Sequence, residues 1–149
     1  MKISSVLAGK PAEVITISPD ANVTELLRVL AEHKIGAVVV SRDGRAIDGI
    51  VSERDVVRAM AADPDAGATG GVRPKAVSTI MTADVLTITP EDTVEGAMVI
   101  MTNSRIRHLP VVNDGALTGL VSIGDIVKAR LADLEHEKAA LVDYVTRGG

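Results

Sequence analysis

The 149-residue sequence contains no cysteine, tryptophan or phenylalanine, and it has a single tyrosine. The absence of cysteine excludes disulfide bonds, thiolate metal ligands and cysteine nucleophiles. Because aromatic residues are almost absent, the core must consist of Val, Ile, Leu, Met and Ala. β-Branched residues favour strands, whereas Leu, Met and Ala favour helices. We therefore expect a mixed α/β fold.

Further absences narrow the functional class. No apolar run reaches the roughly 18 residues of a transmembrane helix, and the N-terminus lacks the apolar stretch of a secretory signal. The net charge is −4, and no cluster of Lys and Arg with interleaved aromatic residues suggests a nucleic-acid partner. Three scattered histidines without cysteine do not form a zinc site. We expect a cytoplasmic protein with no membrane or nucleic-acid partner and no dedicated metal site.

The sequence is internally duplicated, which is the strongest pattern in it. Thr16-Ile17-Ser18-Pro19 recurs as Thr87-Ile88-Thr89-Pro90 at an offset of 71 residues. Gly49-Ile50-Val51-Ser52 recurs as Gly119-Leu120-Val121-Ser122 at an offset of 70 residues. A nearly constant offset over this length predicts two copies of one structural unit.

Each copy is expected to have the element order β-α-β-β-α. The strands are expected at residues 14–17, 37–40 and 47–51 of copy one, and at 85–88, 109–112 and 117–121 of copy two. The helices are expected to begin near Asn22 and Ser52 in copy one, and near Asp92 and Ser122 in copy two, since each is a good N-cap. Asp-Gly pairs at 43–44 and 114–115 predict hairpin turns between the second and third strands.

The duplication divides the chain into four predicted segments. The first repeat is expected at residues 1–61 and the second at 79–130. Between them lies a connector at 62–78, whose Gly, Pro and Asp content is typical of a loop. Residues 131–149 are expected to form a C-terminal helix and tail.

These patterns resemble the CBS domain, and the whole chain resembles a stand-alone tandem CBS pair, or Bateman module. The resemblance covers about residues 3–145. It rests on Thr-Ile-x-Pro after the first strand, Ser52 to Asp55, Arg107 to Val112, and two Gly-h-h-Ser-x-x-Asp signatures in which h is aliphatic. It implies two β-α-β-β-α units related by a pseudo-two-fold axis. It also implies two clefts between the units that bind adenine nucleotides such as AMP, ADP, ATP or NAD(H).

The chemistry of a nucleotide assigns roles to the residues of these signatures. A carboxylate can accept hydrogen bonds from both ribose hydroxyls, so Asp55 and Asp125 are expected on the ribose. Phosphate favours hydroxyls and helix N-termini, which suits Ser52 and Ser122. The other expected nucleotide contacts are Thr16, Ile17, Val38 and Arg54 in copy one, and Thr87, Ile88, Arg107, His108 and Pro110 in copy two.

Ser-x-x-Asp before a helix has a second interpretation that needs no ligand. The same spacing forms a capping box, in which the serine and the aspartate satisfy the first backbone N–H groups of the helix. The two roles do not exclude each other. On the nucleotide interpretation, the glycines at 49 and 119 are expected to allow the ligand to approach the backbone closely.

The two copies differ in charge near these signatures. Copy two has Arg107 and His108 where copy one has Gly36 and Ala37, and copy one has Arg54 where copy two has glycine. We therefore expect two unlike sites. A Mg²⁺ ion is expected only as the companion of a bound di- or triphosphate.

The C-terminal helix carries a heptad-like pattern of spacings of 4 and 3 residues, formed by Val127, Leu131, Leu134, Lys138, Leu141 and Val145. This pattern is typical either of a helix packed on its own domain or of a self-association surface. The resemblance to the CBS family implies a homodimer.

Three functions are compatible with these features. The first is a regulatory sensor whose dimer arrangement responds to a nucleotide and is read by an unidentified protein partner. The second is a structural dimerisation module that acts without nucleotide. The third is an enzyme, because the chain also resembles the CBS pair of IMP dehydrogenase. The catalytic barrel of such an enzyme needs about 250 residues, so we expect no catalytic activity and favour the sensor.

Overall fold

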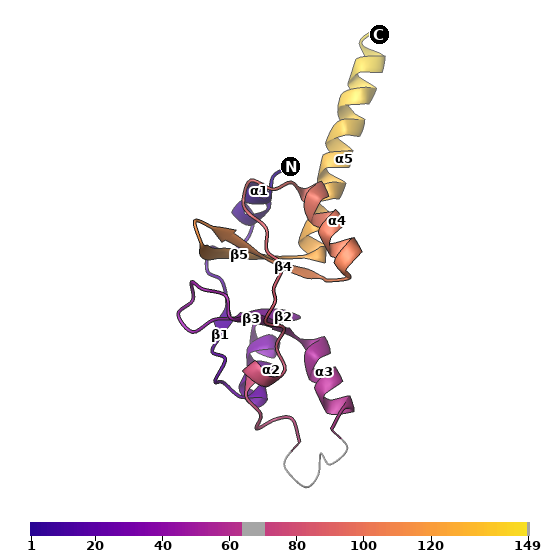
Figure 1. Cartoon of the computed structure of the whole chain (residues 1–149). Coiled ribbons are helices and arrows are strands. Elements are labelled where there is room, and N and C mark those ends of the chain that lie inside the picture. Colours follow the sequence, from indigo (N-terminus) through magenta and orange to yellow (C-terminus); the bar gives the residue numbers. More distant parts are fainter. Residues whose placement is uncertain (64–70, 149) are drawn as a thin grey trace. The chain divides into compact units, whose positions relative to one another are not determined.

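The computed structural model describes residues 1–63 and 71–148 and has a mixed α/β fold (Figure 1), which confirms the predicted fold class. The elements are α1 (Ile3–Ala8), β1 (Thr16–Ile17), α2 (Val23–His33), β2 (Ala37–Val40), β3 (Gly49–Ser52), α3 (Glu53–Ala61), the 3-10 helix η1 (Val77–Thr79), α4 (Val94–Ser104), β4 (His108–Asn113), β5 (Ala116–Ser122) and α5 (Ile123–Thr146). Part of the expected connector, residues 64–70, lies outside the described residues.

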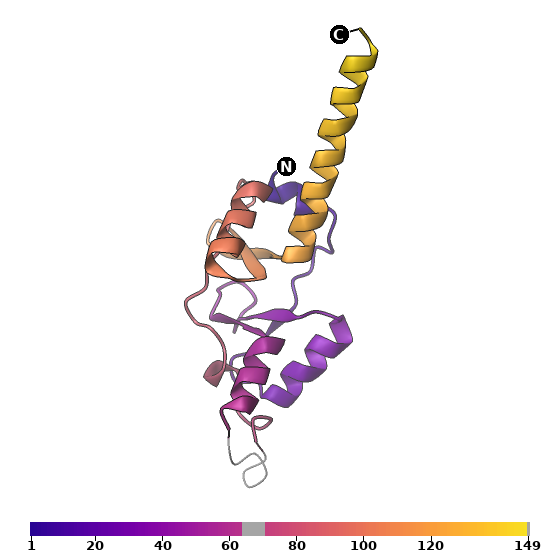
Figure 2. The ribbon, with the colours of Figure 1, turned by 90° about the vertical axis from the view of Figure 1, so that its right-hand side faces the viewer.

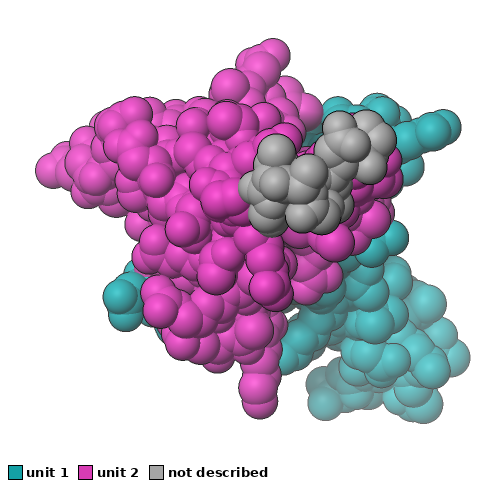
Figure 3. All heavy atoms as spheres, turned by 90° about the horizontal axis from the view of Figure 1, so that it is seen from below, with its two compact units in different colours: residues 1–13, 87–113, 119–149 teal, residues 14–86, 114–118 magenta. Residues whose placement is uncertain are grey.

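The chain forms two compact units, coloured separately in Figure 3. Unit 1 comprises residues 1–13, 87–113 and 119–149, and unit 2 comprises residues 14–86 and 114–118. Each unit has its own cluster of buried aliphatic side chains. The predicted domain limits at 61, 78 and 130 stay a prediction, but residues 1–13 pack with the second copy.

Unit 2 is built on a three-stranded sheet in the order β1-β2-β3. β1 runs parallel to β2, with Thr16 opposite Val39, and β2 runs antiparallel to β3, with Ala37 opposite Ser52. α2 packs its apolar face into the core, because Val23, Leu26 and Leu30 fall on one side of a 3.6-residue repeat and are buried.

Unit 1 combines β4 and the end of β5 with α1, α4 and α5. Its N-terminal segment is tied to the start of α4 by backbone hydrogen bonds from Ile3 N to Asp92 O (2.8 Å) and from Val94 N to Met1 O (2.9 Å). Ile3 is fully buried in the core of this unit. Burial of Ile3 and these bonds explain why residues 1–13 belong to unit 1.

The strand predictions are accurate in the middle of each copy and poorer at its start. β2 spans residues 37–40, as predicted. β1 includes only the second half of 14–17. The strand predicted at 85–88 is wrong, because Ile88 alone bridges to Val111. Ile88 donates to Pro110 O at 3.0 Å and accepts from Val112 N at 2.8 Å, whereas Leu86 is 50% exposed and has no strand partner among the described residues.

The two Asp-Gly pairs form different connections. Asp114 and Gly115 directly join β4 to β5, and both have positive φ (52° and 77°), as a tight hairpin turn requires. In copy one the prediction of a tight turn is wrong, because residues 41–48 form a wider loop. Ser41 and Asp43 hold that loop: the Asp43 Oδ1 atom accepts hydrogen bonds from the backbone N–H groups of residues 45 (2.8 Å) and 46 (2.9 Å).

Three of the four predicted helix caps are confirmed. Asn22 Oδ1 accepts from Glu25 N at 2.9 Å, and Ser52 and Ser122 cap α3 and α5. The prediction of Asp92 as a cap is wrong, because Thr93 caps α4 through a bond from Gly96 N (3.0 Å). Asp92 instead accepts from Thr89 N at 2.7 Å, which stabilises the turn before the helix.

Candidate functional site

The turn from β3 to α3 is shaped by Ser52 and Asp55. Ser52 Oγ accepts from Asp55 N at 3.4 Å. Asp55 Oδ2 in turn accepts from Ser52 N at 2.8 Å and from Ser52 Oγ at 3.1 Å. This is a complete capping box, so the signature has a structural role whether or not a ligand binds.

The turn from β5 to α5 repeats this geometry in copy two. Ser122 Oγ accepts from Asp125 N at 3.1 Å, and Asp125 Oδ2 accepts from Ser122 N at 2.9 Å. In both copies the bonds within the box reach only the Oδ2 atom of the aspartate, and no other described residue bonds to Oδ1. A carboxylate offers about four acceptor positions on two oxygens. The capping role therefore leaves acceptor capacity on each aspartate.

Arg107 lies beside the second turn through its backbone. Its carbonyl oxygen accepts from Ile123 N, the first residue of α5, at 2.8 Å. Gly36 O makes the equivalent contact with Glu53 N at 3.0 Å in copy one. The structure therefore brings the backbone of Arg107 beside Ser122 and the start of α5. The Arg107 side chain is exposed, and its role as an anion contact stays a prediction.

The predicted aliphatic contacts lie in the cores of the units. Ile17 and Val38 belong to the buried cluster of unit 2, and Ile88 belongs to that of unit 1. Pro110 is also buried, within β4. That these side chains also enclose the adenine base of a nucleotide stays a prediction. Their burial in the hydrophobic cores already explains why they are apolar.

The other predicted contacts are closer to the surface. Thr16 is half-buried in β1 and Thr87 is exposed just before Ile88. Arg54 is exposed in the first turn of α3, and His108 is half-buried at the start of β4. Thr16 and Arg54 belong to unit 2, whereas Thr87 and His108 belong to unit 1.

The glycines of the two signatures are explained by packing of the chain itself. A Cβ atom at Gly49 would lie 2.6 Å from Met81 Sδ and 2.7 Å from the backbone oxygen of Thr82. A Cβ atom at Gly119 would lie 2.5 Å from Leu7 Cδ2. At both glycines the close neighbour is the chain itself, Met81 and Thr82 at Gly49 and Leu7 at Gly119. A close approach of a nucleotide to these glycines stays a prediction.

Duplicated strand-to-helix turns of this kind correspond to a known family. The family model of the CBS domain matches residues 10–62 and 77–132. The chain belongs to the CBS-domain family. Its two copies are two CBS domains, as the sequence predicted.

Individual relatives agree with this assignment. A CBS domain-containing protein from Arabidopsis thaliana, named as mitochondrial, is 35% identical over 133 residues, which is 87% of this chain and 62% of that protein. A crystal structure of a CBS-domain protein from Agrobacterium tumefaciens has a TM-score of 0.79 and 40% identity, covering 87% of this chain and 99% of that one. A Pyrobaculum aerophilum CBS domain protein, solved in complex with AMP, has a TM-score of 0.71 and 30% identity, covering 84% and 89%.

Some matching relatives are enzymes, but the matches are partial. The inosine-5′-monophosphate dehydrogenase of Korarchaeum cryptofilum is 39% identical over 115 residues, and the chain covers only 22% of it. The similarity is therefore to a part of that protein, and it transfers no activity to this CBS pair.

Sequence reasoning missed one charged residue at the second CBS domain. Lys10 Nζ donates to Asp125 Oδ2 at 2.6 Å and to Leu120 O at 2.7 Å. Among residues 1–63 and 71–148, no cation pairs with Asp55. No periodicity links Lys10 to a partner 115 residues away, so only the packing of the N-terminal segment reveals the pair. The two CBS domains therefore differ at the aspartate itself.

The pair changes the acidity of Asp125. Burial of the carboxyl group alone would raise its pKa. The hydrogen bond from Lys10, the bond from Ser122 N and the Lys10 charge outweigh burial, so the pKa of Asp125 lies below its ordinary value.

A lowered pKa makes the contribution of Asp125 to stability dependent on pH. The ionised carboxylate contributes fully above the unfolded-state pKa, about 3.9, and the contribution is lost as the pH falls through the lower folded-state pKa. The variant Lys10→Met lacks the cation. We expect its free energy of unfolding to be lower than that of the wild type at pH 6, and the difference to shrink below pH 4.

This comparison can be made by urea unfolding at several pH values. Lys2→Met is a suitable control, because Lys2 pairs with Glu91 on the exposed surface, where an ion pair contributes little. A difference between Lys10→Met and the wild type that is equal at pH 6 and pH 3 would contradict the role given to the pair.

The described parts of the chain contain neither a metal-binding cluster nor a membrane-spanning helix. No group of three or more His, Asp or Glu residues there is arranged to hold a metal ion. In the same residues, no helix combines the length and the apolar character needed to span a bilayer.

Proposed function

We propose that this CBS pair is a regulatory sensor that binds an adenine nucleotide (AMP, ADP, ATP or NAD(H)) at its two Ser-x-x-Asp turns. One observation carries the proposal. In each CBS domain an aspartate sits at the N-terminus of a helix, and the capping bonds use only its Oδ2 atom. Oδ1 is then the acceptor for ribose hydroxyls, and the serine and the helix N-terminus are placed for phosphate. The AMP complex of the Pyrobaculum relative supports this ligand class.

The basic residues give the two sites different characters. At the second turn Lys10, Arg107 and His108 belong to the same unit as Asp125. At the first turn Arg54 is the predicted cation. We propose that the second site binds the ligand with more phosphate charge, and that Mg²⁺ enters only with a di- or triphosphate.

The output of the sensor is a change in a homodimer. A ligand shifts such an equilibrium only if it binds one arrangement more tightly than the other. A separate protein, not identifiable from this chain, would then read the arrangement. Catalysis has no place in this proposal, and the cytoplasmic location expected from the sequence stays a prediction.

The proposal predicts stabilisation by nucleotide. At a ligand concentration a hundredfold above the dissociation constant, the folded state gains about 2.7 kcal/mol. We therefore expect at least one of AMP, ADP, ATP and NADH to raise the melting temperature. The variants Asp55→Ala and Asp125→Ala should each lose binding at one site, as measured by isothermal titration calorimetry.

The matched control is Asp20→Ala, which removes an exposed aspartate that pairs only with Arg42. It should bind like the wild type. If no nucleotide at millimolar concentration changes the melting temperature of the wild type, the proposal fails. The alternative, a nucleotide-independent dimerisation module, would then be preferred.

A further inference from the structure

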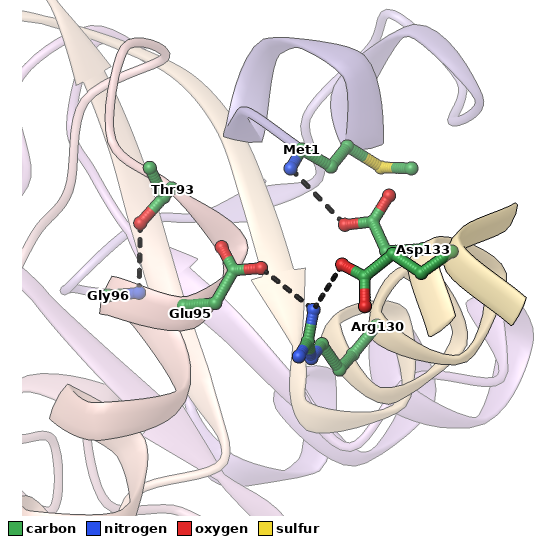
Figure 4. A network of polar contacts seen from close by, with 7 residues as sticks. Met1, Thr93, Glu95, Gly96, Arg130 and Asp133 are labelled. Carbon is green, nitrogen blue, oxygen red and sulfur yellow. Dashed lines mark hydrogen bonds and ion pairs between the residues drawn. The ribbon is translucent and has the colours of Figure 1, made fainter. Parts of the chain in front are cut away.

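The C-terminal half of α5 has no packing partner among the described residues of its own unit. Every residue from 134 to 148 is exposed, and this half of the helix stands clear of the other elements of unit 1 in two perpendicular views (Figures 1 and 2). The first half is anchored: Ile126 and Ala129 are buried, and Arg130 Nη1 bonds to Glu95 Oε1 on α4 at 3.1 Å. Asp133 also bonds to the amino group of Met1 at 3.2 Å (Figure 4).

The exposed surface of α5 is apolar along one stripe. The large hydrophobic side chains that are exposed on this helix are Ile123, Val127, Leu131, Leu134, Leu141, Val142, Tyr144 and Val145, with exposed fractions between 39% and 71%. Val127, Leu131, Leu134, Lys138, Leu141 and Val145 follow one another at spacings of 4 and 3 residues. This stripe is not the face that packs on unit 1, since the buried residues of the helix lie at 126 and 129. A stripe of this period, here interrupted once by Lys138, is typical of helices that pair with another helix.

The charges beside the stripe favour a second copy in antiparallel orientation. Lys128 and Arg130 flank the first half of the stripe, and Glu135 and Glu137 flank the second half. In an antiparallel pair the flanking positions of one helix face the same kind of position on the other. Lys128 then faces Glu135 of the second copy, twice in the dimer. Arg130 likewise faces Glu137 of the second copy, but within one chain it already pairs with Glu95 at 3.1 Å and with Glu137 at 3.8 Å, so the Lys128–Glu135 pair is the one that selects the orientation. Opposite charges at such positions determine partner and orientation.

The same register also matches the apolar residues. Leu131 lies opposite Leu134 of the second copy, and Tyr144 lies opposite its Ile123. Leu141 lies opposite Gly124, where the surface is open, because a Cβ atom at that glycine would meet only Ser122 Oγ at 3.6 Å. Lys138 lies opposite Val127 of the second copy, where its aliphatic stem can pack while the ammonium group stays in water. A parallel pair would instead place Lys138 against Lys138 of the second copy, where like charges repel.

We propose that α5 pairs antiparallel with α5 of a second copy, with Leu131 and Leu134 at the centre of the interface. The interface extends to the second Ser-x-x-Asp turn, because Ile123 and Gly124 lie between Ser122 and Asp125. It consists of α5 side chains and does not require nucleotide, so dimerisation measured without nucleotide tests it separately from the ligand proposal.

Charge reversal tests the orientation of the pair. Lys128 and Glu135 are both exposed, and neither forms an ion pair with a described residue. Lys128→Glu would face Glu135, and Glu135→Lys would face Lys128, so each single variant should weaken the dimer about tenfold in sedimentation equilibrium. The double variant restores both pairs and should dimerise within about threefold of the wild type. Glu32→Lys, on the exposed surface of α2, is the control and should leave the dissociation constant unchanged.

A distance measurement supplies an independent readout. Because the chain has no cysteine, Thr146→Cys introduces a single site for a nitroxide label. At a rise of 1.5 Å per residue, the antiparallel register separates the two labels by about 40 Å along the helix axis, whereas a parallel pair brings them within about 15 Å. A monomeric wild type, single reversals that leave the dimer unchanged, a double variant that does not recover, or a label distance below 20 Å would each overturn the proposal.

Discussion

Replacing Gly49 with alanine should destabilise the protein by about 2–3 kcal/mol, whereas Gly119→Ala should cost about 1 kcal/mol. Both Cβ atoms would meet neighbours closer than 3.0 Å. At Gly49 one neighbour is the backbone oxygen of Thr82, which is fixed because Thr82 and Ile50 exchange two hydrogen bonds of 2.9 Å. At Gly119 the close neighbour is the end of the Leu7 side chain, which can rotate away.

Urea unfolding followed by circular dichroism measures both losses. Gly9→Ala is the control, because a Cβ atom there meets only Val6 O at an ordinary 3.6 Å, and it should change the free energy of unfolding by less than about 0.5 kcal/mol. Equal losses at positions 49 and 119 would show that the fixed carbonyl is not the cause. The experiment thus separates two causes for a glycine at the same place in the two CBS domains: a fixed backbone oxygen at Gly49 and a movable side chain at Gly119.

Removal of the two signature aspartates should have unequal effects on stability. Asp55→Ala loses a capping box, which costs about 1 kcal/mol. Asp125→Ala loses the same box and also leaves the half-buried Lys10 without its carboxylate, so we expect a loss of roughly 2–3 kcal/mol. The duplication makes each aspartate the control for the other.

Asparagine substitutions separate the contribution of the capping box from that of the ion pair with Lys10. Asn keeps an oxygen that can accept from the serine N–H but carries no charge. Asp55→Asn should therefore be nearly neutral, whereas Asp125→Asn should lose the contribution of the pair with Lys10. In a double-mutant cycle with Lys10→Met, a coupling energy of zero would refute that contribution.

Several features of the fold could be predicted because their causes are local in the sequence. The duplication is visible as a constant offset. The strand at 37–40 is Ala37 followed by three consecutive valines. Ser52 and Ser122 predict helix starts, because a capping side chain bonds to a residue only three positions away. The candidate aspartates follow from the same short motif. Family membership followed from the order of these motifs, and the match to the CBS-domain model confirmed it.

Other features depended on contacts between distant residues. Whether Asp92 or Thr93 caps α4 was decided by a turn that uses Asp92 for Thr89. Residues 85–88 have strand propensity, but only Ile88 meets a partner.

The sequence by itself therefore determined the repeated unit and its serine and aspartate turns, because hydrophobic period and capping act over a few residues. Only the tertiary structure decided that Lys10 reaches Asp125 and that Leu7 and Met81 occupy the space beside the two glycines. Those contacts join segments that are far apart in the chain. They form only when the folded segments pack together, so no periodic pattern in the sequence predicts them. The asymmetry between the two CBS domains at their aspartates is accordingly a property of the folded chain.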